Sequence, residues 1–264
     1  MSEFLNVTLL GVLQGVAEFL PISSSGHLVI GQHLLGMEEG GLRLNVVLHF
    51  GTLLAVFFYY RKRILALTLG IFGFGDAAGE RIYAAKLILA ALPAIPVYFL
   101  FKEPLEAMTA NARMVGALLM FTGAILKGTR YLPRGEKPVS FLRAFMMGCA
   151  QAVALLPGIS RSGMTLASAR AGRVGAEEAA AFSFLMSSPL ILGGTLLETI
   201  EIFTEQTPSA GEDVPPLLLA WGAVLAATVG YFSLVLLVRT LSGKRFWWFG
   251  CYCLAAGLLT VCLL

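Results

Sequence analysis

The sequence is poor in charged residues. Only 13% of its 264 residues are Asp, Glu, Lys or Arg, about half of the roughly 25% found in soluble domains. Hydrophobic residues make up 57%, and the mean hydropathy is +0.80. Apolar runs long enough to cross a hydrocarbon core of about 30 Å recur along the whole chain, and they are continuous rather than alternating. We therefore predict an all-α polytopic membrane protein.

Several familiar signals are missing. The cysteines show no CxxC or Cys/His spacing, so neither a disulfide framework nor a zinc site is expected, and we predict buried small hydrophobes at Cys149, Cys251, Cys253 and Cys262. The chain has no GxxxxGK[ST], GxSxG or HExxH motif. Its first residues lack a basic region and a cleavage site. We expect a mature, single membrane domain (1–264) without a soluble module or a nucleic-acid partner.

Two apolar regions, 4–36 and 141–170, are interrupted in the middle by LPISSSGH and LPGISRSGMT. Proline and glycine beside serines break a helix, and a broken backbone survives in a membrane only where protein or water satisfies it. Each region is too short for two crossings, so we predict a re-entrant pair of half-helices at each. Six other segments are predicted to span the membrane: 44–60, 83–101, 112–128, 178–199, 216–238 and 246–263.

The charges support this arrangement. With both broken regions re-entrant, one side receives Arg61, Lys62, Arg63, Arg81, Lys127, Arg130, Arg134, Lys137, Arg143, Arg170, Arg173, Arg239, Lys244 and Arg245. The other side receives few basic residues and an acidic set: Glu38, Glu39, Glu103, Glu106, Glu201, Glu205, Glu212 and Asp213. The positive-inside rule makes the basic side cytoplasmic and places both termini on the external, periplasmic face.

The two broken regions also form an internal repeat with an offset of 137 residues. Without a gap, the aligned identities are Gly11 with Gly148, Gln14 with Gln151, Ser23 with Ser160, Ser25 with Ser162 and Gly26 with Gly163. Each copy is followed by three predicted spans, an odd number, so the second copy starts on the opposite face. We predict an inverted-topology repeat (about 1–130 and about 138–264) whose broken helices meet near the midplane.

Two half-helix starts in a bilayer make an anion site, because each carries unpaired N–H groups and about +0.5 charge. Arg161 adds a guanidinium that matches phosphate bidentately, although a structural ion pair with Glu18 is the alternative. Glu18, with Gln14 one turn earlier, can hold a divalent cation or move a proton.

Other polar residues beside the breaks have more than one interpretation. His27 can act as base, acid or nucleophile, and Ser24 and Ser160 are candidate nucleophiles or phosphate donors. The serines can equally serve as caps or as sites of close helix packing. We expect His49 to line the cavity without acting in catalysis, and Ser183 to face it.

The segments QGVAEFLPISSSGHL and LLPGISRSGMT closely resemble the two signatures of the undecaprenyl-diphosphate phosphatase family, also called bacitracin-resistance proteins. The resemblance covers essentially the whole chain. It implies hydrolysis of undecaprenyl diphosphate to undecaprenyl phosphate and inorganic phosphate in the bacterial inner membrane, which supports peptidoglycan synthesis and bacitracin resistance.

The resemblance also implies roles for individual residues and a requirement for a divalent cation, Mg²⁺ or Ca²⁺. Catalysis is carried over to Glu18, Ser24, His27 and Arg161, and phosphate binding to Ser23, Ser25, Ser160, Arg161, Ser162 and Thr165. Metal binding falls to Glu18 and weakly to Gln14. Some family members have glutamate where this chain has Gln14. Glutamine is a poorer metal ligand and cannot act as a base, so metal binding and proton handling depend mainly on Glu18.

Some questions stay open at this point. The attacking group is Ser24, His27 or a water that His27 activates. A lipid-carrier flippase or transporter is the main alternative function, because inverted repeats with broken helices are typical of alternating access. Membrane lipids and a second copy of the chain, forming a homodimer, are expected partners, and the cavity is expected to open to the external face.

Overall fold

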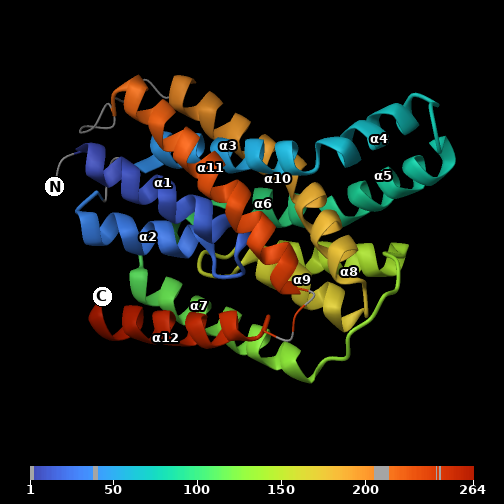
Figure 1. Ribbon diagram of the computed structural model, residues 1–264. Coiled ribbons are helices and arrows are strands. Elements are labelled where there is room, and N and C mark those ends of the chain that lie inside the picture. The colour runs from blue at the N-terminus through green and yellow to red at the C-terminus, as the bar shows by residue number, and fades with distance from the viewer. Residues whose placement is uncertain (1–2, 38–40, 205–213, 242, 244) are drawn as a thin grey trace.

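The computed structural model describes residues 3–37, 41–204, 214–241, 243 and 245–264. In this part of the chain the regular structure is helical, apart from one isolated bridge between Lys137 and Val174. The helices, shown in Figure 1, are α1 Glu3–Phe19, α2 Ser24–Leu35, α3 Gly41–Tyr59, α4 Arg61–Ile71, α5 Ala77–Ala91, α6 Ala94–Thr109, α7 Ala112–Gly128, the 3-10 turn η1 Thr129–Tyr131, α8 Phe141–Val153, α9 Arg161–Ala171, α10 Ala176–Thr204, α11 Pro216–Leu241 and α12 Trp248–Leu263. The all-helical prediction is confirmed.

Several helices are long and apolar enough to cross a membrane. Three qualify as single stretches: Ala77–Leu105, Ala176–Ile200 and Pro216–Leu241. A fourth results if Arg43–Tyr59 and Arg61–Ile71, which meet at 76°, form one broken span. The helices at the remaining predicted spans, α7 and α12, have 17 and 16 residues, or roughly 25 Å each at 1.5 Å per residue. The chain is thus a multi-pass membrane protein by length and composition.

The predicted connection after residue 60 is instead a helical hairpin. The helix α4 continues from Arg61, and α5 begins at Ala77, where the Asp76 side chain caps it by accepting a hydrogen bond from Gly79 N at 3.1 Å. Arg63 pairs with Glu80, which ties the two helices together. Figure 1 shows this hairpin extending from the rest of the bundle.

Both helix breaks occur where the sequence predicts them. The helix α1 ends at Phe19 and α2 begins at Ser24, while α8 ends at Val153 and α9 begins at Arg161. The hydroxyl of Ser23 accepts a hydrogen bond from Gly26 N at 3.3 Å, and that of Ser160 accepts one from Gly163 N at 3.1 Å. Each serine therefore satisfies one of the free N–H groups at the start of its helix.

Small residues let the helices that carry the breaks pack closely. The helix α1 packs on α11, and α8 packs on α5 and α6. A Cβ added at Gly15 would lie 2.9 Å from Gly230 N, and one added at Gly123 would lie 2.8 Å from Gly250 O, where α7 packs along α12 (Figure 1). Backbones that approach this closely are typical of membrane helices.

Part of the sequence interpretation needs correction or falls outside the described residues. Cys253 is buried, but Cys149 and Cys262 are exposed on the protein surface. Burial was the wrong inference for these two, because an apolar helix in a membrane can turn its apolar side chains outward. Outside the described residues, or described without their side chains, are Glu38, Glu39, Glu106, Glu201, Glu205, Glu212, Asp213 and Lys244.

Candidate active site

The two breaks lie against one another through their backbones. A Cβ added at Gly26 would lie 3.1 Å from the Cα of Gly158, and one added at Gly163 would lie 3.4 Å from the Cβ of Pro21. Each capped helix start therefore contacts the break of the other copy. Side chains from both halves of the sequence meet at this junction.

Two further helices hold the breaks in place. On α7, the Thr122 hydroxyl donates to Gly158 O at 3.1 Å and accepts from Ser160 N at 3.0 Å. On α12, the Cys253 thiol donates to Pro21 O at 3.6 Å. These bonds satisfy backbone groups that leave the helical pattern, as buried polar groups require.

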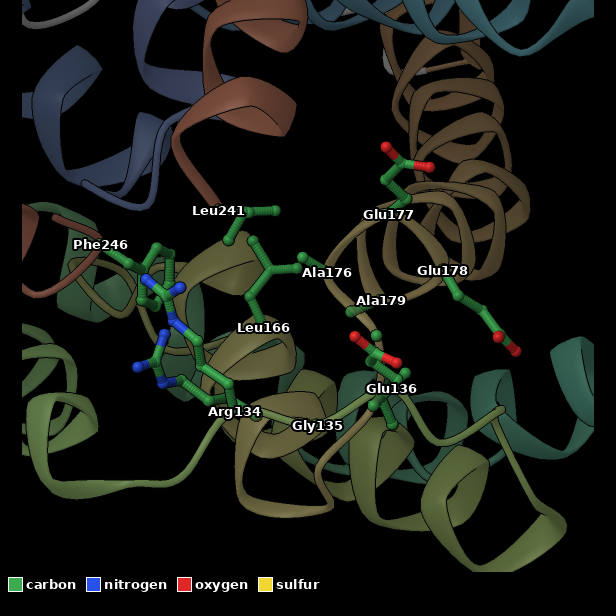
Figure 2. Close-up of a pocket in the computed structure, with 13 residues that line it drawn as sticks. Arg134, Gly135, Glu136, Leu166, Ala176, Glu177, Glu178, Ala179, Leu241 and Phe246 are labelled. Carbon is green, nitrogen blue, oxygen red and sulfur yellow. The ribbon is translucent and has the colours of Figure 1, made fainter. Parts of the chain in front are cut away.

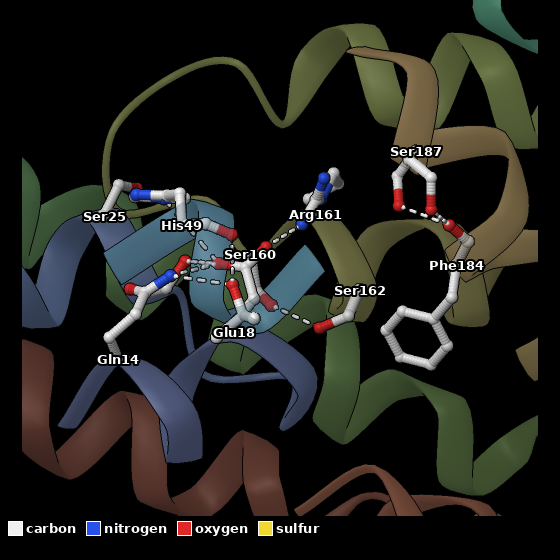
Figure 3. A network of polar contacts seen from close by, with 12 residues as sticks. Gln14, Glu18, Ser25, His49, Ser160, Arg161, Ser162, Phe184 and Ser187 are labelled. Carbon is white, nitrogen blue, oxygen red and sulfur yellow. Dashed lines mark hydrogen bonds and ion pairs between the residues drawn. The ribbon is translucent and has the colours of Figure 1, made fainter. Parts of the chain in front are cut away.

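Glu18 is the centre of the polar group at the junction. Its side chain is 2% exposed, and one carboxylate oxygen forms an ion pair with Arg161. The other oxygen accepts hydrogen bonds from Ser24 Oγ at 2.6 Å and from Gln14 Nε2 at 3.1 Å. Figure 3 shows Glu18 between Gln14 and Arg161. A buried carboxylate needs such a cation and such donors to stay charged.

The helix α3 adds two residues to this group. His49 Nε2 lies 3.8 Å from the Glu18 carboxylate, and the Thr52 hydroxyl lies 3.5 Å from Gln14 Nε2. The Nδ1 of His49 donates to Asn45 O at 2.8 Å, so Nε2 is the nitrogen that faces the carboxylate. The sequence interpretation did not single out Thr52, whose only signal is its place one turn after His49 on the same helix face.

His27 has a different environment. Its Nδ1 donates to Ser23 O at 2.9 Å, which leaves Nε2 to accept a hydrogen bond from the Tyr252 hydroxyl at 2.8 Å. The two rings also stack, with centroids 5.6 Å apart. The structure thus brings Gln14, Glu18 and Arg161 together with Ser24, and directs His27 toward α12.

The remaining predicted phosphate-binding residues lie around the two helix starts. The hydroxyls of Ser23 and Ser25 are 3.4 Å apart, and those of Ser160 and Ser162 are 3.3 Å apart. Thr165 is buried one turn further along α9, where its hydroxyl lies 2.6 Å from that of Ser183 on α10. Thr165 therefore joins two helices, and its predicted contact with phosphate stays a prediction.

The junction offers few side-chain ligands for a divalent cation. Among the described residues, no three His, Cys, Asp or Glu side chains gather in a way that could hold a metal. Beside Glu18, however, Gln14 Oε1 is buried and no described residue donates a hydrogen bond to it. One carboxylate and one free amide oxygen fit a Mg²⁺ ion that takes most of its ligands from substrate phosphates and water.

This fold and this site define a class of protein: a multi-pass helical membrane protein with a charged site where two broken helices meet. A family model described as bacitracin resistance protein BacA matches residues 7–259. The chain belongs to this family.

Curated relatives cover nearly the whole chain. The undecaprenyl-diphosphatase of Desulfatibacillum aliphaticivorans is 38% identical over 97% of this chain and 96% of the relative. That of Salinibacter ruber is 36% identical over 97% of both. The protein named undecaprenyl-diphosphatase 4 of Bacillus cereus is 35% identical over 99% of this chain and 97% of the relative.

Proposed function

We propose that this chain is an integral membrane phosphatase that hydrolyses undecaprenyl diphosphate to undecaprenyl phosphate and inorganic phosphate. The reaction recycles the lipid carrier of peptidoglycan synthesis and thereby supports bacitracin resistance. The observation that carries the proposal is the buried Glu18 with the half-buried Ser24 and Arg161 between two capped helix starts. Family membership and the names of the relatives support the same conclusion.

The positive charge of the junction binds the diphosphate. Arg161 is the first residue of α9, so its guanidinium lies beside the free N–H groups of that helix start. When the diphosphate enters, Arg161 exchanges its pairing with Glu18 for bidentate contacts to phosphate. The hydroxyls of Ser23, Ser25, Ser160 and Ser162 supply further hydrogen bonds.

The hydrogen bond of 2.6 Å from Ser24 Oγ to Glu18 favours Ser24 as the nucleophile. Its oxygen attacks the terminal phosphorus while its proton passes to the Glu18 carboxylate. The bond from that phosphorus to the bridging oxygen breaks, and undecaprenyl phosphate leaves. Water then attacks the phosphoserine, the bond from phosphorus to the Ser24 oxygen breaks, and Glu18 returns its proton to that oxygen as inorganic phosphate leaves. Arg161 and the helix starts stabilise the charge that develops on the phosphoryl oxygens.

His27 acts as a positioning residue in this scheme. Both of its ring nitrogens are engaged, one by the Ser23 carbonyl and the other by the Tyr252 hydroxyl. These bonds fix the turn that precedes Ser24, and so fix the direction in which the Ser24 hydroxyl points.

The junction would bind a divalent cation, Mg²⁺ or Ca²⁺, together with the diphosphate. Glu18 and the free Oε1 of Gln14 are the side-chain oxygens that would hold it, and it would neutralise phosphate charge. Glu18 would thus take part in both proton handling and metal binding, and Gln14 in metal binding alone.

We further propose that the regions α1–α2 and α8–α9 are re-entrant, in an inverted repeat with both termini on the periplasmic face and an outward-opening cavity. The capping pattern supports this, because serines 137 positions apart make equivalent hydrogen bonds. The start of α1 and the end of α12 also lie at the same end of the molecule (Figure 1). The homodimer stays a prediction.

Phosphate release from undecaprenyl diphosphate in detergent tests the function. Wild-type protein should release phosphate and lose this activity when EDTA is added. Glu18→Gln should lower the rate about 100-fold or more, because the carboxamide cannot accept the Ser24 proton. Glu80→Gln is the matched control, since Glu80 also pairs with an arginine but on the remote α4–α5 hairpin. A transporter would release no phosphate, and that result would overturn the proposal.

A further inference from the structure

A charged cavity lies at the opposite end of α9 from Arg161. It has a volume of about 770 Å³ and is lined by the α7–α8 connection, α9, the first turn of α10, the end of α11 and Phe246 (Figure 2). The helix α9 has 11 residues, so roughly 15 Å separate its two ends at 1.5 Å per residue. This cavity is therefore distinct from the junction of the two breaks.

One wall of the cavity carries two arginines of like charge. Arg134 and Arg170 line it and are close enough for their charges to repel. In the described part of the chain, the Nε of Arg170 is buried without a hydrogen-bond partner, and one of its terminal nitrogens donates a long bond, 3.5 Å, to Leu132 O. Within the described residues, neither guanidinium forms an ion pair. Two adjacent guanidiniums without a carboxylate favour an anion with several oxygens, such as a phosphate.

The other wall carries carboxylates. Glu178 is engaged, because it accepts a hydrogen bond from Val139 N at 2.8 Å. Glu136 and Glu177 form no ion pair or hydrogen bond within the described part of the chain, and Figure 2 shows them across the cavity from Arg134 and Phe246. The cavity thus holds separated positive and negative groups that do not neutralise one another.

We propose that this cavity binds the headgroup of a zwitterionic phospholipid that carries a phosphate and a primary amine, that is, a phosphatidylethanolamine. The phosphate contacts Arg134 and Arg170, and the ammonium group donates its three N–H bonds toward Glu136 and Glu177. A lone phosphate would leave the acidic wall unpaired, whereas a dipolar headgroup serves both walls.

The size and the remaining lining agree with a lipid. The volume falls within the range of about 300–1,000 Å³ that ligand sites occupy. Leu166, Leu241 and Phe246 give the cavity an apolar side for the glycerol and the first acyl carbons. The basic connections that carry Arg134 and Arg170 belong, in the proposed topology, to the cytoplasmic face, where lipid headgroups lie.

Lipid retention tests the proposal without reference to phosphatase activity. The protein is reconstituted into vesicles of equal parts phosphatidylethanolamine, phosphatidylglycerol and phosphatidylcholine, extracted into detergent, and its bound lipids are counted by native mass spectrometry. Wild type should retain phosphatidylethanolamine about tenfold over phosphatidylcholine, whose methylated amine has no N–H to donate. Equal retention of the three lipids would overturn the proposal.

Variants separate the two walls. The double variant Arg134→Gln/Arg170→Gln should lose about tenfold of the phosphatidylethanolamine, and Glu136→Gln/Glu177→Gln should lose the preference over phosphatidylcholine while keeping phosphatidylglycerol. Arg245→Gln and Glu103→Gln, at exposed positions outside the cavity, are the controls and should match wild type. The single variants Arg170→Gln and Arg170→Lys separate binding from folding. Arg170→Lys keeps the charge, so it should retain the lipid that Arg170→Gln loses. Wild-type retention in both double variants would refute the assignment.

Discussion

The first and second helix breaks share a frame and differ in their chemistry. In both, a serine caps the following helix, and a glycine three residues later contacts the other break. The residue directly after the cap differs: it is Ser24, bonded to Glu18, in the first break and Arg161 in the second. One copy supplies an acceptor and a hydroxyl, the other a cation. Neither copy alone holds the three groups that the proposed reaction needs.

The backbone of the two breaks differs as well. Ser23 has a φ of 72°, whereas its counterpart Ser160 has a φ of −74°. The second break places its left-handed residue at Gly158, where φ is 94° and no Cβ penalty arises. A serine in a sparsely populated region costs about 1–3 kcal/mol. The first break accepts this cost at the position whose hydroxyl caps α2.

The largest effect is expected from removing the cation of the second break. Arg161→Ala should lower phosphate release about 1,000-fold, because it removes a charge-assisted phosphate contact and leaves Glu18 buried without its partner. Arg161→Lys should recover only part of the rate, since an ammonium group cannot make the bidentate contact. Phosphate-release kinetics on both variants check this, with Arg143→Ala as a control away from the junction. Full activity in Arg161→Ala would show that the active site does not lie at the junction.

An intermediate effect is expected from the glycine of the second break. In Gly158→Ala the new Cβ would overlap Val115 O, and the alanine would have to keep the positive φ of the glycine. We expect the free energy of unfolding to fall by about 2–4 kcal/mol. Thermal unfolding in detergent measures it. Gly36→Ala isolates the conformational part, because Gly36 has a φ of 67° and open space around it. Equal losses in the two variants would show that the close contact of Gly158 with α7 contributes nothing.

The smallest effect is expected from Gln14 and Gln151, the two glutamines that align in the internal repeat. Gln14 donates to Glu18, whereas both amide atoms of Gln151 are buried and have no partner among the described residues. Gln14→Leu should lower activity about tenfold, while Gln151→Leu should leave activity unchanged and stability equal or higher by about 1 kcal/mol. Rates and melting temperatures of the pair check this. If Gln151→Leu lost as much activity as Gln14→Leu, the different chemical roles assigned to the two breaks would be wrong.

Local features of this fold could be predicted from the sequence, because their causes are local. Proline, glycine and serine within a few residues stop one helix and cap the next, so the positions of both breaks and the equivalence of Ser23 and Ser160 followed directly. The Arg161–Glu18 pair was foreseen only as an alternative to a free phosphate-binding arginine. The structure contains this pair, and the proposed reaction requires it to open.

Features that depend on helix rotation could not be predicted. We expected His49 to line the cavity, but nothing in the sequence indicates that it faces Glu18 or that His27 turns toward Tyr252, because rotating α3 or α2 by a fraction of a turn would change these contacts. The α4–α5 hairpin was missed for a related reason: residues 61–82 were left between two predicted spans, but the apolar residues that follow Arg63 form a helix. The exposed Cys149 and Cys262 show that hydrophobic sequence context does not distinguish protein from lipid neighbours.

The contact between Gly26 and Gly158 has a mechanical consequence. With backbone against backbone and no side chain between them, and with Thr122 and Cys253 bonded to the two loops, the starts of α2 and α9 form one joint. Sliding or tilting either half-helix would require breaking that joint and exposing its carbonyl groups. Any opening of the site therefore has to come from the surrounding helices, while the two charged ends keep a fixed spacing from one turnover to the next.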